Sequence, residues 1–268
     1  MCSFLSVLIL KNGDIRHHPM LDSHSDLVTY FKLPDTDHFI RHFAKAELTP
    51  GDWLDVATWT WRVDEETIPA WLTEQMVRDA AAATRAIASK MILRTGQHRF
   101  IVDGCWILGG NVTVSDIRGG RIMRVQDSAT VQNVRGSATV QNVRGSATVR
   151  DVGDSATVQN VGDSATVQNV GGYATVQDVG DSATVQNVRG SATVQNVRGS
   201  AAVQNVWGYA TVQNVRGSAT VQNVGDSATV QNVWGYATVR DVRDSATVRD
   251  VRDSVCLDAS ARASLEKN

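Results

Sequence analysis

Residues that could ligate a metal ion are concentrated near the N-terminus. All six histidines lie within the first 98 residues, and carboxylates accompany several of them. His38 and His42 are four residues apart, a spacing that places two imidazoles on one face of a helix and suits a zinc site. No cysteine pair or His-Glu motif accompanies them, so a polar surface is the simpler interpretation, and we expect no metal and no cofactor. The residues of this group are His17, His18, Asp22, Ser23, His24, Ser25, Asp26, Asp37, His38 and His42.

Cys2 offers a nucleophile. It follows the initiator methionine, which is usually removed before a small residue, so the thiol and a free α-amine would share one residue. A cysteine in this place, followed by a strand and a hairpin, resembles the start of the N-terminal-nucleophile hydrolases. That resemblance implies a thiol that attacks and an amine that serves as its base. It covers roughly the first fifteen residues and no downstream oxyanion motif matches, so a Cys2 hydrolase is the alternative hypothesis.

Five aromatic residues in the second half of the chain are candidate binding residues. They replace small or charged residues at the boundaries between repeated units, where we expect the chain to turn a corner. Exposed aromatic side chains are favoured contact residues at protein interfaces. The other interpretation is that the rings pack on neighbouring corners. The five are Tyr173, Trp207, Tyr209, Trp234 and Tyr236.

These boundaries separate copies of a nine-residue unit that repeats fourteen times between Asp127 and Arg252. Most units read Asp/Gly-Ser-Ala-Thr-Val-Gln-Asn-Val-Arg/Gly, with Asp127 at position 1. Position 3 is Ala and positions 5 and 8 are Val in every unit. Apolar and polar residues therefore alternate over positions 3 to 6 with the period of a strand. So short a unit cannot bury its apolar face alone and must stack on others.

The remaining positions predict how the strands are joined. Position 8 faces inward only if the chain bends near position 7, which is Asn or Asp, and stacked Asn side chains would form ladders. Positions 9 and 1 include Gly at twelve of fourteen junctions, in either place, which suits a corner that needs a positive φ. We therefore expect a mainly-β protein with a parallel β-solenoid. The small inward residues favour two units per coil over three.

The first part of the chain predicts a small α+β domain that would also cap the solenoid. Residues 3–10 indicate a strand, and Asn12-Gly13 a hairpin. Residues 69–92 indicate a helix capped by Thr67, with Pro69 in its first turn and one apolar stripe. That stripe contains Leu72, Met76, Ala80, Ala83, Ile87 and Met91. We expect the domain over residues 1–98, the solenoid over 99–261 and a polar tail over 262–268.

Composition limits the function. The net charge of −2 indicates neither nucleic acid nor membrane as a partner. Three widely spaced cysteines fit a reducing compartment, so we expect a cytoplasmic protein. The calcium-binding nonapeptide pattern Gly-Gly-x-Gly-x-Asp is absent. Thr at position 4 in thirteen units would form rows, and an ice- or surface-binding solenoid is a further alternative.

The whole layout resembles uncharacterised bacterial and phage-encoded nonapeptide-repeat proteins. The likeness consists of Met1-Cys2, Asn12-Gly13-Asp14, Asp22-Ser23-His24 and the nonapeptide array. It implies a β-solenoid and brings no known activity. Because a convex array offers no cleft for catalysis, the leading hypothesis is a non-enzymatic scaffold. Its partner would be another protein or a second copy of the chain.

Overall fold

The computed structural model describes residues 5–34 and 42–265 of the 268-residue chain. The chain divides into two compact units, Met1–Leu93 and Arg94–Asn268. The boundary expected after residue 98 falls inside β6 (Gln97–Ile101), the first strand of the second unit, so the division lies earlier than composition indicates.

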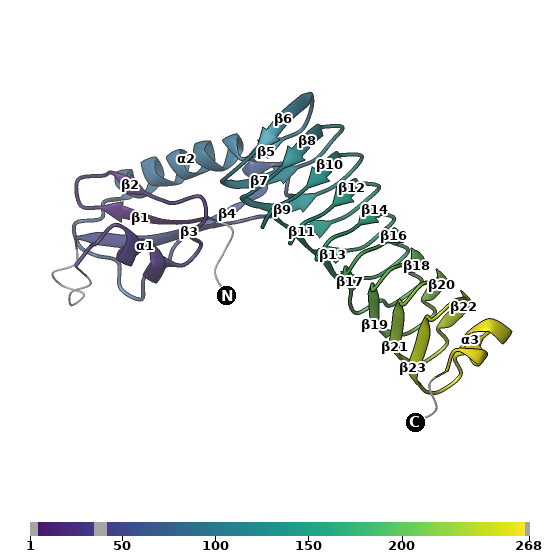
Figure 1. The fold of residues 1–268 in the computed structure, drawn as a ribbon. Helices are drawn as coiled ribbons and strands as arrows, with labels where there is room; N and C mark the ends of the chain where they lie inside the picture. Colours follow the sequence, from purple (N-terminus) through teal and green to yellow (C-terminus); the bar gives the residue numbers. More distant parts are fainter. Residues whose placement is uncertain (1–4, 35–41, 266–268) are drawn as a thin grey trace. The chain divides into compact units, whose positions relative to one another are not determined.

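A four-stranded antiparallel sheet in the order β2-β1-β3-β4 forms the base of the first unit (Figure 1). The predicted hairpin is confirmed, because Ile9 of β1 pairs with Ile15 of β2 and Gly13 turns the chain with a φ of +88°. The strands are β1 (Leu5–Leu10), β2 (Ile15–Arg16), β3 (Phe43–Thr49) and β4 (Thr60–Val63).

Helices cover this sheet, and β1 is buried along nearly its whole length. Leu8 of β1 packs with Leu27 and Val28 of α1 (His24–Tyr30). The second helix, α2 (Glu74–Lys90), contacts both β1 and the short 3₁₀ helix η1 (Val56–Thr58). Apolar side chains from sheet and helices thus make a small core of the predicted α+β kind.

The predicted helix over residues 69–92 begins later than expected. Its N-cap is Thr73, whose hydroxyl accepts a hydrogen bond from the Met76 N–H at 3.2 Å, and not Thr67. Pro69 starts a separate turn, closed by a bond from the Leu72 N–H to the Pro69 carbonyl. The apolar stripe is only partly buried: Leu72, Ala80 and Met91 lie in the core, while Ala83 is exposed.

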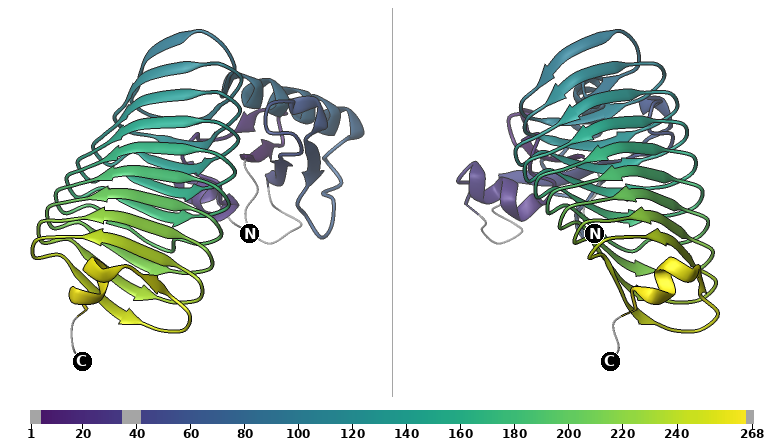
Figure 2. Two further views of the ribbon diagram at one scale, coloured as in Figure 1. Left: turned by 90° about the vertical axis from the view of Figure 1, so that its right-hand side faces the viewer. Right: turned by 45° about the vertical axis from the view of Figure 1, so that its right-hand side comes forward.

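The second unit is a parallel β-solenoid, as predicted (Figures 1 and 2). Each strand pairs with the strand two units further along, for example Thr130 with Thr148 and Thr139 with Thr157. One coil therefore takes two units, which confirms the predicted coil of eighteen residues. Even-numbered strands from β6 onward form one sheet, and the odd-numbered strands from β7 onward form the other.

The strands of the solenoid are short, and most have five residues. The first unit ends with β5 (Ile92–Leu93). In the second unit, β6, β7 (Cys105–Leu108), β8 (Thr113–Ile117) and β9 (Arg121–Val125) precede the uniform repeats. The repeats form β10 (Thr130–Val134), β11 (Thr139–Val143), β12 (Thr148–Val152), β13 (Thr157–Val161), β14 (Thr166–Val170), β15 (Thr175–Val179), β16 (Thr184–Val188), β17 (Thr193–Val194), β18 (Ala202–Val206), β19 (Thr211–Val215), β20 (Thr220–Val224), β21 (Thr229–Val233), β22 (Thr238–Val242) and β23 (Thr247–Val251). The last strand is β24 (Cys256–Leu257).

Positions 3, 5 and 8 fill the interior, as the repeat predicts. Ala129, Val131 and Val134 have no exposed surface, and their equivalents as far as Val248 are at most 3% exposed. Burying one valine side chain stabilises a fold by roughly 1.5–3 kcal/mol, and a coil contains four such valines. Because the adjacent coils provide that burial, each coil is stable only within the stack.

Position 1 always turns the corner, in the left-handed conformation. Its φ is +64° to +75° where it is glycine and +53° to +61° where it is aspartate. Glycine at position 9, as in Gly153 or Gly180, does not adopt positive φ, so the residue at position 1 makes the turn whether it is glycine or aspartate. Aspartate adds a bond between coils: the Asp154 carboxylate accepts the Gly136 N–H at 3.0 Å.

Position 7 forms the predicted amide ladders. The Asn205 side-chain amide donates to Asn187 Oδ1 at 3.0 Å, and Asn223 donates to Asn205 at 2.9 Å. The backbone changes along the ladder. From Asn196 onward position 7 has a φ of +43° to +57°, whereas no earlier position 7 within the repeats has positive φ.

The C-terminal end of the solenoid is capped, and the predicted polar tail from residue 262 begins inside helix α3 (Ala259–Ala263) (Figure 2). Asp258 caps α3 by accepting the Ala261 N–H at 2.8 Å. Its other oxygen accepts the Asp241 N–H of the preceding coil at 2.8 Å, and the Ser260 hydroxyl accepts the Val242 N–H at 2.9 Å. The cap thus binds backbone groups that an open strand edge would leave unpaired.

Candidate functional site

The corners of the solenoid form two rows, because each coil has two junctions. Row A is the set of junctions that follow the even-numbered strands from β10 to β22, and row B is the set that follows the odd-numbered strands from β9 to β23. Each junction comprises positions 9, 1 and 2. Position 1 fixes the turn, so positions 9 and 2 carry the side chains that the rows display.

The five predicted aromatic residues are divided between the rows. Tyr173, Trp207 and Tyr209 lie in row A, whereas Trp234 and Tyr236 lie in row B. The three tyrosines occupy position 2, which is serine in the other eleven units. Their side chains extend into solvent: Tyr173 is 76%, Tyr209 75% and Tyr236 74% exposed. The structure therefore assembles three of the five in one row and separates the other two from them.

The tryptophans differ from the tyrosines because they are half-buried. Trp207 lies over Gly225, the equivalent position of the next coil. A Cβ atom placed on Gly225 would come within 2.2 Å of the indole. The alternative interpretation for all five residues is packing on a neighbouring corner. Trp207 packs in this way, whereas the three tyrosines are exposed.

The outward faces of both sheets carry threonine, glutamine and asparagine. Thr at position 4 pairs in register with Thr two units away, and the Oγ1 atoms of Thr229 and Thr247 are 3.4 Å apart. These threonines are only half exposed. The faces therefore present ordered rows of hydroxyl and amide groups about 4.8 Å apart.

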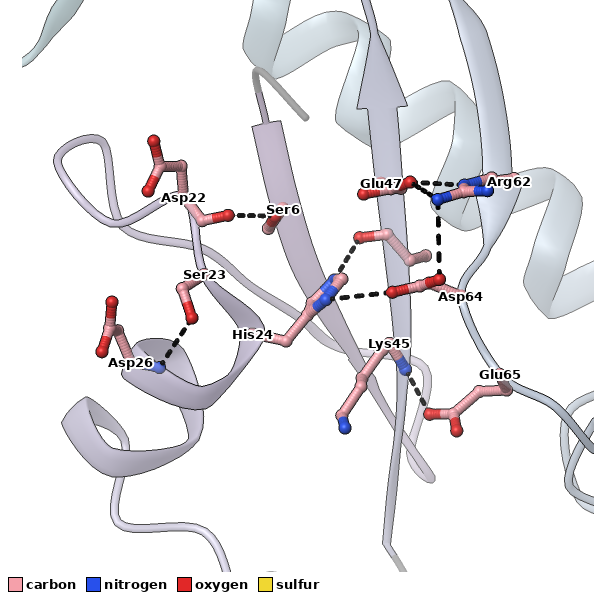
Figure 3. Close-up of polar contacts among 11 residues, drawn as sticks. Ser6, Asp22, Ser23, His24, Asp26, Lys45, Glu47, Arg62, Asp64 and Glu65 are labelled. Atoms are coloured by element: carbon pink, nitrogen blue, oxygen red, sulfur yellow. Dashed lines mark hydrogen bonds and ion pairs between the residues drawn. The ribbon is translucent and has the colours of Figure 1, made fainter. Parts of the chain in front are cut away.

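In the first unit, polar side chains link α1 to the sheet (Figure 3). His24 Nε2 lies 3.0 Å from the Ala46 carbonyl oxygen, and its Nδ1 lies 3.4 Å from the Asp64 carboxylate. Arg62 pairs with Glu47 and lies 3.7 Å from Asp64. Glu47 is only 5% exposed, so the arginine compensates a buried charge.

This network holds secondary structure together. Both ring nitrogens of His24 face acceptors, one in β3 and one directly after β4, so the ring is fixed in place. The Ser6 hydroxyl donates to the Asp22 carbonyl at 2.6 Å, which fixes the loop before α1. Sequence reasoning placed His24 in a surface cluster and missed its contacts, because Ala46 and Asp64 are distant in sequence. Glu47, which stands between Ala46 and Leu48 in β3, was the available signal.

The N-terminal histidines that the structure describes are not gathered into a metal site. Within residues 5–34 and 42–265, no group of three or more His, Cys, Asp or Glu side chains is arranged to hold a metal ion. Burial and the neighbouring charge of His18 lower the pKa of His17. Asp37 and His38 lie outside the described residues, as does Cys2. Cys105 is buried in β7 and Cys256 is exposed in β24.

Comparisons with known proteins assign no family, since no protein-family model, curated protein or solved structure matches the chain. Within the described residues, none of the helices has the length and apolar character needed to cross a membrane.

Proposed function

We propose that this protein is a non-enzymatic scaffold whose solenoid presents the tyrosines of its corners to a protein partner or to a second copy of the chain. The observation that carries the proposal is the exposure of Tyr173 and Tyr209 in row A. We also place the chain with the bacterial and phage-encoded nonapeptide-repeat proteins that it resembles, on the motifs of its N-terminal residues and its repeat.

The chemistry of row A supports binding. Tyr173 and Tyr209 are two coils apart, which corresponds to about 10 Å along the stack. Between them lies Arg189, and Trp207 belongs to the same corner as Tyr209. Tyrosine, tryptophan and arginine are the residue types enriched at binding hot spots. A stiff array also holds them in place before binding, which reduces the entropy lost on association.

The repeat supplies a substitution that removes the rings without disturbing the corners. Replacing Tyr173, Tyr209 and Tyr236 by serine restores the residue found in the other eleven units. We expect the triple variant to keep the melting temperature of the wild type. We expect it to lose self-association, measured as molar mass by light scattering after size exclusion over a series of protein concentrations. A variant with Ser191→Ala, in row A between the two tyrosines, is the matched control.

A wild-type chain that is monomeric throughout the series would refute self-association. The other possibility, binding to a different protein, is then tested with a photo-crosslinking residue at position 209 and, in a second variant, at position 191. Crosslinks to one defined protein from 209 and not from 191 support it. Equal yields from both positions contradict it.

A further inference from the structure

Row B contains a polar hollow of about 190 Å³ between β11 and β17. It exists because position 9 is glycine in two successive coils of this row, at Gly162 and Gly180, while arginine occupies the coils on either side. The hollow is lined by Arg144, Asn160, Val161, Asp178, Gly180, Asp181, Arg198 and Gly199.

The two arginines of the hollow are in different states. Arg144 Nη1 lies over Gly162 and forms an ion pair of 3.2 Å with Asp181. Arg198 lies against Gly180, where an added Cβ atom would be 3.5 Å from its Nε. No carboxylate within the described residues forms an ion pair with Arg198. One guanidinium is therefore neutralised, and the other remains available to an anionic group.

The hollow also lies at an interruption of an amide ladder. Asn196 donates to Asp178 Oδ1 at 3.0 Å, as one rung donates to the next elsewhere. Asp178 has no side-chain N–H, so it cannot donate to Asn160 below it. Asp178 and Asn160 both line the hollow, and within the described residues no side-chain hydrogen bond joins them. Each of the other three aspartates at position 7 is preceded in the sequence by a positively charged arginine, whereas Asp178 is preceded by the uncharged Gln177.

These charges select the ligand. A simple anion would meet the Asp178 carboxylate, and a simple cation would meet the Arg198 guanidinium. A molecule with one carboxylate and one ammonium group satisfies both sides at once. The volume lies below the range of about 300–1,000 Å³ typical for drug-sized ligands, so only a small molecule fits.

We propose that this hollow binds a small α-amino acid, with its carboxylate on Arg198 and its ammonium group between Asp178 and Asn160. The site lies in row B and is independent of the proposed interaction through Tyr173 and Tyr209 in row A. The two proposals therefore succeed or fail separately.

The test is equilibrium dialysis of the full chain against radiolabelled glycine and L-alanine. We expect saturable binding of one molecule per chain, and no competition from acetate or methylammonium at equal concentration. Absence of saturable binding by either amino acid overturns the proposal. Competition by acetate alone would show an anion site and would also overturn it.

The repeat again supplies matched variants. Gly180→Arg introduces the commonest residue of position 9 and fills the hollow, so binding should weaken at least about tenfold. Gly171→Arg makes the same change in row A, where no atom lies within 4 Å of the added Cβ, and should bind as the wild type does. Asp178→Asn restores the ladder and should abolish binding, whereas Asp151→Asn should not. Equal binding by Gly180→Arg and wild type would contradict the proposed location.

Discussion

At the scale of single residues, glycine and aspartate meet the same backbone demand at position 1 in different ways. Glycine adopts positive φ because it has no Cβ atom. Aspartate tolerates the left-handed region and also accepts an N–H of the preceding coil, as Asp226 does from Gly208 at 2.9 Å. The choice between them therefore decides whether a corner adds a side-chain hydrogen bond to the backbone of the preceding coil.

This difference predicts opposite effects of two substitutions at Gly190, whose φ is +66°. Gly190→Ala places a Cβ atom 3.2 Å from the Gly172 nitrogen and forces alanine into the left-handed region. We expect a loss of stability of about 1 kcal/mol. Gly190→Asp should be neutral or stabilising, because its carboxylate can accept the Gly172 N–H. Urea denaturation of both variants measures the difference, and equal destabilisation by alanine and aspartate would contradict it.

The sequence predicts that the chain turns at these corners, but it does not show whether position 9 or position 1 makes the turn. Arg135-Gly136 and Gly153-Asp154 have their glycines in opposite places, so composition alone permits a turn at either position. The structure resolves this because the side chain at position 1 points to the backbone of the preceding coil, a contact between residues eighteen apart. The conformational preferences of neighbouring residues give no information about a contact between residues so far apart in the sequence.

At the scale of elements, the C-terminal cap depends on one carboxylate. Burial raises the pKa of Asp258, but hydrogen bonds from Ala261, Ser260 and Asp241 outweigh it and hold the pKa below its usual value. A depressed pKa means that folding favours the ionised form. The stabilisation is therefore fully present above the pKa of the unfolded chain and is lost as the pH falls through the folded value.

Asp258→Ala should consequently destabilise the chain by about 1 kcal/mol near neutral pH, the usual effect of losing an N-cap. The gap in melting temperature between wild type and variant should stay constant at neutral pH and narrow below about pH 4. Asp258→Asn keeps an N-cap acceptor without the charge, so it should lie between the two and depend less on pH. A gap that widens on acidification would contradict this role.

The start of α2 shows why sequence locates elements better than their ends. Thr67 with Pro69 forms a plausible helix start, and Thr73 followed by Glu74 forms another. The chain uses Thr73, and the residues from Pro69 to Leu72 make a turn instead. Both starts satisfy local rules, so only packing against the sheet distinguishes them.

At the scale of the whole molecule, the uniform repeat made the solenoid and its coil size predictable. The alanine and the two valines of the first unit, Ala129, Val131 and Val134, have equivalents in every unit. Three inward positions in nine residues suit a thin coil. The first unit has no such redundancy. Its link from His24 to Ala46 and Asp64 depends on one arrangement of three distant segments, which no periodicity indicates.

Removal of the C-terminal cap should change how the stacked coils associate. Truncation before Asp258 deletes α3 and exposes the strand edges of the last coils, which are templates for further pairing. We expect the shortened chain to form larger assemblies than the full chain at equal concentration, measured by light scattering. The truncation should have this effect in the triple tyrosine variant as well. Unchanged molar mass in both backgrounds would contradict a capping role for residues 258–265.

The eighteen-residue coil gives the number of units a parity. Recombination between near-identical stretches can add or remove units. A change of two units moves every later residue by one whole coil, so each corner stays in its own row. A change of one unit transfers all later corners to the other row. Deleting residues 217–225 alone would bring Tyr236 into line with Tyr173 and Tyr209. Whether the number of preceding units is odd or even therefore determines which of the two rows each aromatic residue occupies.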